Sequence, residues 1–226
     1  MKYPQQMQEL ERDITELSPE QCAEAIQHLP DDVISDALEL ASGNLTRKIG
    51  NRLKEVIEDP ESLRPYARGK FYLATNNMQK AKEAFQEALA ANENPAACHN
   101  ELGMIASATQ DIDVATTHYK KAIALGYNNA HNNLGILYET IGQMELAERH
   151  FRSANHPYSK FNLGHMYMTT KRYEEAIEPL REALRKGCHQ GYYLLACAYL
   201  QCGQKELAEE MMAIAAVKGD GRAHVY

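Results

Sequence analysis

Apolar residues recur along most of the chain at intervals of three or four, which is the spacing of one face of an α-helix. Leu134 and Tyr138 belong to one such stripe, and Ala147 and Phe151 belong to the next. The turn-prone pair Gly142-Gln143 lies between them. This pattern predicts two helices joined by a short turn, which together form a helical hairpin.

The same order of residues occurs five times. Each copy has a small residue in its first helix, a small Ala twelve residues later and a large apolar residue sixteen residues later. The small residues that mark the copies are Gly69, Gly103, Gly135, Gly164 and Ala196. Their spacings are 34, 32, 29 and 32 residues. A repeat of this period indicates a stack of similar hairpins, each of which buries its apolar stripe against its neighbours.

Close packing of paired helices explains why the small positions recur. Gly135 and Ala147 leave room for the two helix axes to approach, and Phe151 fills the space where the helices diverge. We therefore expect Gly135 to lie against the second helix of its own hairpin.

The recurring Leu-Gly-x-x-Tyr, Ala, aromatic, Ala order resembles the tetratricopeptide repeat family over roughly residues 62–219. The family's early Trp is absent, and the joints at 125–130 and 218–223 are similar to the Sel-like variant. The resemblance implies an all-α fold, a right-handed α-α superhelical solenoid of about five hairpins. The expected repeats are 62–95, 96–127, 128–156, 157–188 and 189–220.

Residues 1–61 lack the repeat and form a separate predicted segment before the repeat domain at 62–226. Apolar stripes such as the one from Met7 to Leu17 predict about four helices there, and Ser18-Pro19 is typical of a helix start. Two interpretations remain open for this segment. It covers the open end of the solenoid, or it is a docking or oligomerisation module.

Charge is distributed unevenly along the chain. Residues 1–62 carry 14 acidic and 6 basic residues, whereas the remainder is nearly neutral and the net charge is −7. Because nucleic-acid binders usually show a basic face, we expect no nucleic-acid partner. No apolar run is long enough to cross a membrane, and we expect no membrane partner. The odd number of cysteines, five, favours reduced thiols and a cytoplasmic location.

The resemblance implies that a partner protein binds in the concave groove lined by the first helix of each hairpin. The partner would supply a peptide or a helix, held by aromatic anchors and by side-chain amides that bond to its backbone. The expected partner-binding residues are Tyr66, Lys70, Asn100, Met104, Asn132, Ile136, Tyr158, Phe161, His165, Met168 and Tyr193.

Two details refine this expectation. Asn100 and Asn132 occupy the same place in successive hairpins, so both are predicted to face the partner. The family's clamp for C-terminal carboxylates needs further basic residues where this chain has the neutral Asn129 and Asn133, although Lys70 lies near one clamp position. The sequence therefore predicts a different ligand from that carboxylate.

Signals of catalysis or metal binding are weak. The nine histidines form no His-Glu-x-x-His motif, and Cys188, Cys197 and Cys202 form no Cys-x-x-Cys pair. We therefore expect no enzyme activity, no catalytic residue, no metal and no cofactor. His165 is the one residue whose titration we would test.

The sequence favours a non-catalytic protein-interaction scaffold or adaptor. Two alternatives remain open: a self-assembling repeat scaffold that forms a homo-oligomer, or a regulatory subunit of a larger enzyme or secretion complex. The apolar last stripe, which includes Met211 and Val217, would serve self-assembly.

Overall fold

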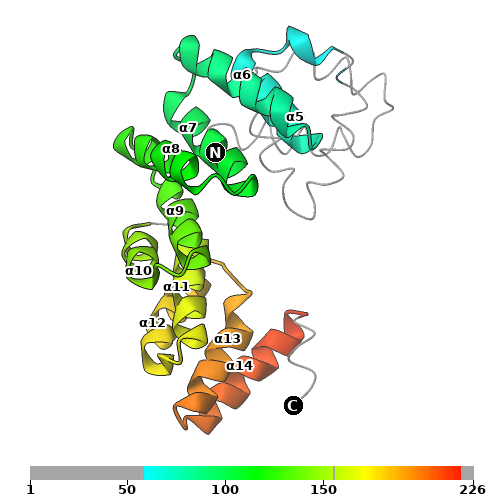
Figure 1. Cartoon of the computed structure of the whole chain (residues 1–226). Coiled ribbons are helices and arrows are strands. Elements are labelled where there is room, and N and C mark those ends of the chain that lie inside the picture. The colour runs from blue at the N-terminus through cyan, green and yellow to red at the C-terminus, as the bar shows by residue number, and fades with distance from the viewer. Residues whose placement is uncertain (1–56, 58, 155, 220–226) are drawn as a thin grey trace, which may run out of the picture. The chain divides into compact units, whose positions relative to one another are not determined.

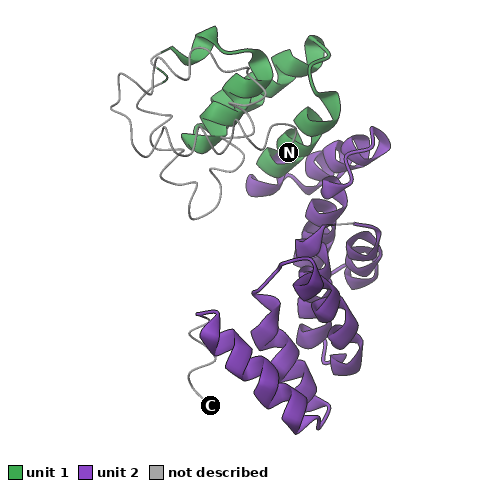
Figure 2. Cartoon of the chain, turned by 180° about the vertical axis from the view of Figure 1, so that it is seen from behind, with its two compact units in different colours: residues 1–105 green, residues 106–226 purple. Residues whose placement is uncertain are grey.

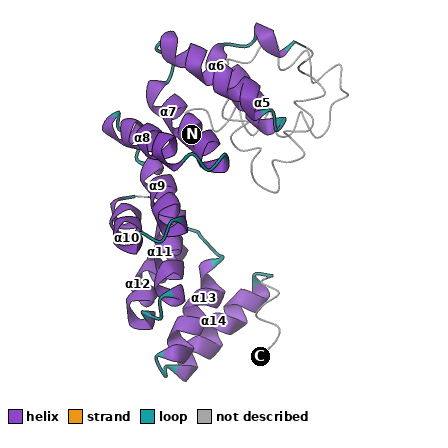
Figure 3. Ribbon diagram, viewed as in Figure 1, coloured by secondary structure: helices purple, strands orange, loops and turns teal. Residues whose placement is uncertain are grey.

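The computed structural model of the chain describes residues 57, 59–154 and 156–219. Within these residues the regular structure is entirely helical (Figure 3). The four helices predicted in residues 1–61 lie almost wholly outside the described part, so that prediction stays a prediction. The all-α fold class predicted from the repeat is confirmed.

The chain divides into two compact units, residues 1–105 and 106–226 (Figure 2). In the first unit, the short 3₁₀ helix η1 precedes a hairpin of two helices, and a third helix follows and runs into the second unit. Their bounds are Pro60–Ser62 for η1, Pro65–Ala74 for α5, Met78–Ala90 for α6 and Pro95–Ala108 for α7.

The second unit contains α8 and three further hairpins, in each of which the first helix packs on the second (Figure 1). Neighbouring hairpins are also in contact, because α10 packs on α11 and α12 packs on α13. The bounds are Ile112–Ala124 for α8, Asn129–Thr140 for α9, Met144–Ser153 for α10, Pro157–Thr169 for α11, Tyr173–Arg185 for α12, Gly191–Gln201 for α13 and Lys205–Val217 for α14.

Each predicted turn within a hairpin contains a residue with positive φ, which ends the first helix. In α9–α10 this residue is Gly142 at φ 75°, whereas in α11–α12 it is Lys171 at φ 59°. In two hairpins, the residue after the positive-φ residue caps the N-terminus of the second helix with its side chain. Asn77 accepts a hydrogen bond from the Lys80 amide at the start of α6, and Asp111 accepts one from the Val114 amide at the start of α8.

The recurring small residues lie in the seam between paired helices, as the sequence predicted. A Cβ atom placed on Gly135 would come within 2.6 Å of the Phe151 ring. The same relation holds for Gly69 and Phe85, and for Gly164 and Leu180. At these three places, where Phe or Leu occupies the facing position, the close approach of the two helices requires glycine.

A single apolar core runs through the second unit. It joins buried residues of all three hairpins with those of α8, so each hairpin buries its stripe against its neighbours. Leu134, Phe151, Tyr167 and Leu180 are among its largest fully buried side chains. On the other side of α9, Ile136 is exposed and lies outside this core.

Candidate protein-binding face

The side chains of α9, α11 and α13 that point away from the second helices form what we term the first-helix face of the second unit. On α9 they recur at intervals of four and three, at Asn132, Ile136 and Glu139, between the buried positions of the same helix. The face consists of Asn132, Ile136, Glu139, Phe161, Asn162, His165, Met168 and Leu200.

An amide pair joins two helices across this face. The Asn162 side-chain amide on α11 donates a hydrogen bond to the Asn132 side-chain carbonyl on α9, with a nitrogen–oxygen distance of 3.0 Å. Among the described residues, the amide hydrogens of Asn132 and the carbonyl oxygen of Asn162 have no further side-chain partner. A donor and an acceptor are therefore offered side by side, which is what an extended peptide backbone requires.

Apolar groups surround the amide pair. Ile136 is 42 % exposed, although it is a large aliphatic side chain. Phe161 lies next to His165 with the two ring planes at 22° and the centroids 6.4 Å apart. Phe161 and Met168 are only half-buried, because one side of each packs against the core of the unit. The other side of each of these two side chains is open to solvent.

Glu139 is the acidic residue of the face. Its carboxyl group is half-buried, and none of the described residues forms an ion pair or a hydrogen bond with it. Burial raises the pKa of Glu139, and the charge of the nearby His165 offsets this only in part. Glu139 and His165 therefore lie near each other on neighbouring helices without forming a direct ion pair.

The expected binding residues of the first unit are placed differently. Lys70 is 7 % exposed, and its ammonium group lies 3.2 Å from Glu101 on α7. Asn100 is 3 % exposed and Tyr66 is also buried, so among the four only Met104 is exposed. The spacing of the repeat could not show this, since burial depends on neighbouring elements. Tyr66, Lys70 and Asn100 therefore do not present their side chains at the surface.

The two expected tyrosines of the second unit also differ from each other. Tyr158 is exposed at the start of α11 and stacks on His156, whose ring nitrogen accepts a hydrogen bond from the Tyr158 amide. Tyr193 on α13 is half-buried. The structure thus pairs Asn132 with Asn162 and Phe161 with His165, and it places Tyr158 in the first turn of α11.

A polar network that the sequence did not reveal links the third and fourth hairpins. The Glu148 carboxylate on α10 accepts hydrogen bonds from Arg172, Tyr167 and Arg152, at 2.7, 2.7 and 3.1 Å. Burial by itself would raise the pKa of Glu148, but these donors outweigh it and lower the pKa to about 2. The Arg172 guanidinium also lies 4.3 Å above the Tyr167 ring. This network stabilises the joint between the two hairpins.

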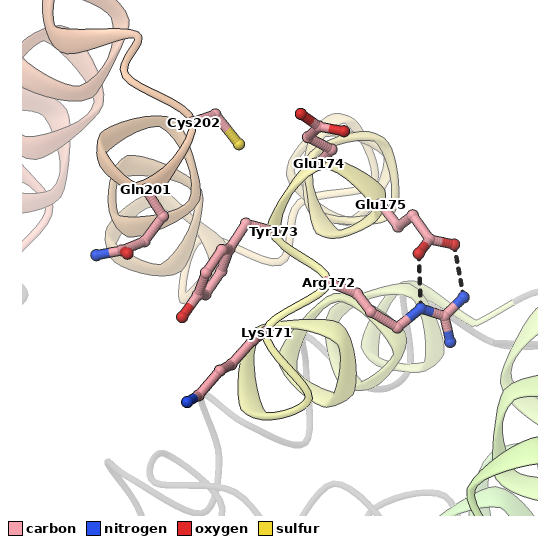
Figure 4. Close-up of a pocket in the computed structure, with 7 residues that line it drawn as sticks. All are labelled: Lys171, Arg172, Tyr173, Glu174, Glu175, Gln201 and Cys202. Atoms are coloured by element: carbon pink, nitrogen blue, oxygen red, sulfur yellow. Dashed lines mark hydrogen bonds and ion pairs between the residues drawn. The ribbon is translucent and has the colours of Figure 1, made fainter.

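A shallow pocket of about 250 Å³ lies beside this network, at the turn of the fourth hairpin. It is lined by Lys171 to Glu175 and by Gln201 and Cys202 (Figure 4). Figure 4 shows the Arg172 side chain turned towards Glu175, to which it donates two hydrogen bonds. Burial raises the pKa of the Cys202 thiol, and the charge of Glu174 adds to this effect. The pocket therefore lacks an activated nucleophile at this cysteine.

A histidine pair lies in the third hairpin. The Nδ1 atoms of His131 and His150 are 2.9 Å apart, and the Tyr138 ring stacks on His150. Burial lowers the pKa of His150 to about 4, with further contributions from His131, Arg149 and Lys120. At neutral pH the pair is therefore uncharged and acts as a packed polar contact between α9 and α10.

The described residues also bear on metal binding and membrane insertion. No group of three or more His, Cys, Asp or Glu side chains is placed to hold a metal ion in this part of the chain. None of the helices that the structure describes has both the length and the apolar character of a membrane span.

A sequence model of the tetratricopeptide repeat matches residues 66–95, 157–185 and 189–213. These segments coincide with the hairpins α5–α6, α11–α12 and α13–α14. The chain carries tetratricopeptide repeats. Repeats of this family build protein-interaction scaffolds, so this is the general class of function that the fold supports.

Solved structures share the repeat architecture. A crystal structure of MamA has a TM-score of 0.57 at 20% identity, covering 69% of this chain and 96% of that chain. The protein PilF of Pseudomonas aeruginosa has a TM-score of 0.59 at 16% identity, covering 84% and 94%. The anaphase-promoting complex hetero-tetramer Cut9–Hcn1 also has a TM-score of 0.59, at 18% identity, covering 91% of this chain and 43% of that one. At these identities the likeness shows the fold.

No curated protein matches the sequence significantly. The repeat model also leaves the third hairpin, α9–α10, unmatched, although its Gly135 and Phe151 pack like the corresponding residues of the matched repeats. The tetratricopeptide geometry is therefore retained where the repeat sequence has diverged.

Proposed function

We propose that this chain is a non-catalytic protein-interaction scaffold that binds an extended peptide segment of a partner protein on the first-helix face of the second unit. The tetratricopeptide repeats support the general class. The finer proposal rests on the chemistry of this face, where polar and apolar groups alternate along α9 and α11. Such a mixture provides both backbone hydrogen bonds and side-chain anchors.

The single observation that carries the proposal is the Asn132–Asn162 amide pair. A side-chain hydrogen bond between two repeats fixes both amides in orientation, so little rotamer entropy remains to be lost when a ligand binds. The exposed Ile136 lies one turn along α9 from this pair. A peptide that bonded to the amides would cover this aliphatic side chain at the same time.

We place the protein in the cytoplasm, because Cys98, Cys188 and Cys202 form no disulfide within the part of the chain that the structure describes. We assign it no catalysis, no nucleic-acid ligand and no membrane ligand. Its partners are proteins.

The test is affinity capture from a native lysate of the source organism with three versions of the full chain. The first is the wild type. The second is the double variant Asn132→Ala, Ile136→Ala on the first-helix face. The third is the control Leu146→Ala on α10, which removes a similarly exposed aliphatic side chain from a second helix. Quantitative mass spectrometry then compares the captured proteins.

We expect at least one protein to be retained by the wild type and the control and lost by the double variant. Circular dichroism should show equal helicity for all three chains, because the substituted side chains lie at the surface. If every protein captured by the wild type is captured equally by the double variant, the first-helix face is not the binding site.

One observation supports self-assembly as a second candidate. Val217, at the end of α14, is 86 % exposed, and Leu207 on the same helix is also exposed. Met211 packs against the core and Ala215 is buried, so only part of the predicted last stripe is open. Light scattering of the purified chain separates the candidates, because a strict monomer at high concentration contradicts self-assembly through α14.

A further inference from the structure

Glu139 has no counter-ion within ion-pair distance among the residues that the structure describes. Its carboxyl group lies on α9, seven residues after Asn132 and three after Ile136, so the three side chains point to the same side of the helix. It is half-buried among them. Among the described residues, the only charge that acts on it is that of His165, which is too distant for an ion pair.

A half-buried carboxylate without a donor is costly to a folded protein. Its loss of hydration is not compensated, and the raised pKa of Glu139 reports that cost. A ligand that brings a guanidinium or an ammonium group to this carboxylate would restore the missing hydrogen bonds in a site that is already partly dehydrated. Charge-assisted hydrogen bonds of this kind are about twice as strong as neutral ones.

The surroundings of Glu139 are unfavourable for an acidic ligand. His165 is the one titratable group that α11 brings to it. The nearest lysine on α11, Lys160, is engaged elsewhere, because it donates a hydrogen bond to the Arg152 carbonyl oxygen and lies 4.0 Å from Glu182. An acidic peptide would be repelled by the Glu139 carboxylate, with only His165 near it to offset the repulsion.

We propose that the first-helix face selects extended peptides in which a lysine or arginine lies close to a large apolar residue, and that Glu139 is the residue that sets this preference. The basic side chain binds the Glu139 carboxylate. The apolar side chain packs on Ile136 and against the Phe161–His165 stack, and the peptide backbone bonds to Asn132 and Asn162. This inference rests on the proposed function, since it specifies the ligand of the same face.

The experiment selects a phage-displayed library of random twelve-residue peptides on the full chain at neutral pH and physiological salt. Parallel selections use Glu139→Gln, which keeps the shape and removes the charge, and Glu139→Lys, which reverses it. A fourth selection uses the double variant Asn132→Ala, Ile136→Ala. Binding of synthetic peptides from the wild-type pool is then measured by fluorescence anisotropy on all four proteins.

We expect the wild-type pool to be enriched in Lys or Arg at a fixed spacing from Leu, Ile, Met or Phe. The Glu139→Gln pool should lose the basic enrichment, and the Glu139→Lys pool should gain acidic residues instead. Individual wild-type peptides should bind Glu139→Gln about tenfold more weakly, the change that loss of one partly buried charge pair produces.

Three results would overturn the inference in distinguishable ways. Peptides that depend on Asn132 and Ile136 but show no basic enrichment refute the role of Glu139 and leave the proposed function standing. A wild-type selection that enriches no peptide at all, or only peptides that bind the double variant equally well, refutes both the role of Glu139 and the proposed function. A dimer in light scattering that Ile136→Glu separates shows that a second copy of this chain occupies the face, and this also excludes the peptide.

Discussion

The two sides of α9 differ in a way that separates folding from recognition. The side that faces α10 carries Leu134, Gly135 and Tyr138, all buried. The opposite side carries Asn132, Ile136 and Glu139, which are half-buried or exposed. Both sides have the same period and the same backbone. What differs is whether the protein itself supplies the contacts that each side chain needs.

Two glutamates of the third hairpin make the difference concrete. Glu148 accepts hydrogen bonds from three donors and its pKa falls to about 2, whereas Glu139 has no donor within the described part of the chain and its pKa rises. The first carboxylate therefore stabilises the fold when it is ionised, while ionisation of the second costs stability. A charged group whose partners lie within the chain serves the structure, and one that lacks partners is suited to bind a ligand.

The largest expected effect on stability comes from adding a methyl group where α9 packs closely against α10. Gly135→Ala should lower the free energy of unfolding by about 2 kcal/mol, because the added methyl group would overlap the buried Phe151 ring, and overpacking outweighs the gain in helix propensity. Urea unfolding followed by circular dichroism measures this change.

The fifth hairpin supplies a control for that prediction. Ala196 occupies the place of Gly135 there, and Met212 occupies the place of Phe151. Adding Phe151→Met to Gly135→Ala should therefore restore part of the lost stability, since a flexible side chain can move away from the new methyl group. If the double variant is no more stable than Gly135→Ala, the steric explanation is wrong.

A smaller loss is expected from Glu148→Gln, which keeps the shape of the side chain and removes its charge. We expect a decrease of about 1–2 kcal/mol at pH 7, because three charge-assisted hydrogen bonds are weakened. The matched variant Glu139→Gln should cause no loss, since no donor contacts that carboxylate among the described residues.

The pH dependence of the Glu148 variant follows from the lowered pKa. The advantage of the wild type should be complete above the ordinary pKa of 4.5 and should disappear as the pH falls towards about 2, where Glu148 is protonated in the folded chain as well. Thermal unfolding of both proteins at several pH values between 7 and 2 checks this. A stability difference that stays constant over that range would show that the charge of Glu148 is not involved.

The smallest effect is a gain in stability at the start of α11. Ser159 is fully buried, and its hydroxyl group has no hydrogen-bond partner among the residues that the structure describes. Ser159→Ala should raise the free energy of unfolding by about 0.5–1 kcal/mol. The reciprocal change, Ala130→Ser at the buried equivalent position of α9, should lower it by a similar amount. Urea unfolding of the two variants, with opposite signs expected, tests the assignment.

The sequence was a reliable guide to the seam and a poorer one to the exposed face. The repeat predicted the hairpins, their turns and the contact of Gly135 with α10, because all three depend on residues close together in the chain. It treated Asn100 and Asn132 as equivalent. In the structure Asn100 is buried, whereas Asn132 is half-buried and bonded to Asn162.

The exposed face was harder to predict because the burial and hydrogen bonding of a polar side chain depend on residues from neighbouring hairpins. Two of the three donors to Glu148, Tyr167 and Arg172, lie on α11 and in the turn that follows it. Lys70 pairs with Glu101, which is thirty-one residues away. A local pattern of apolar and polar positions does not show which residues so far apart in the sequence will pair. The same holds for Glu139, whose importance lies in the absence of a donor around it in the described part of the chain.

The sequence by itself determined that this chain forms tandem helical hairpins, because helix period, small seam residues and turn residues are local properties that recur at a fixed interval. Only the tertiary structure decided which polar side chains are satisfied and which remain open to a partner. That outcome depends on which helices pack against each other. It is therefore decided by contacts between residues that are far apart in the sequence.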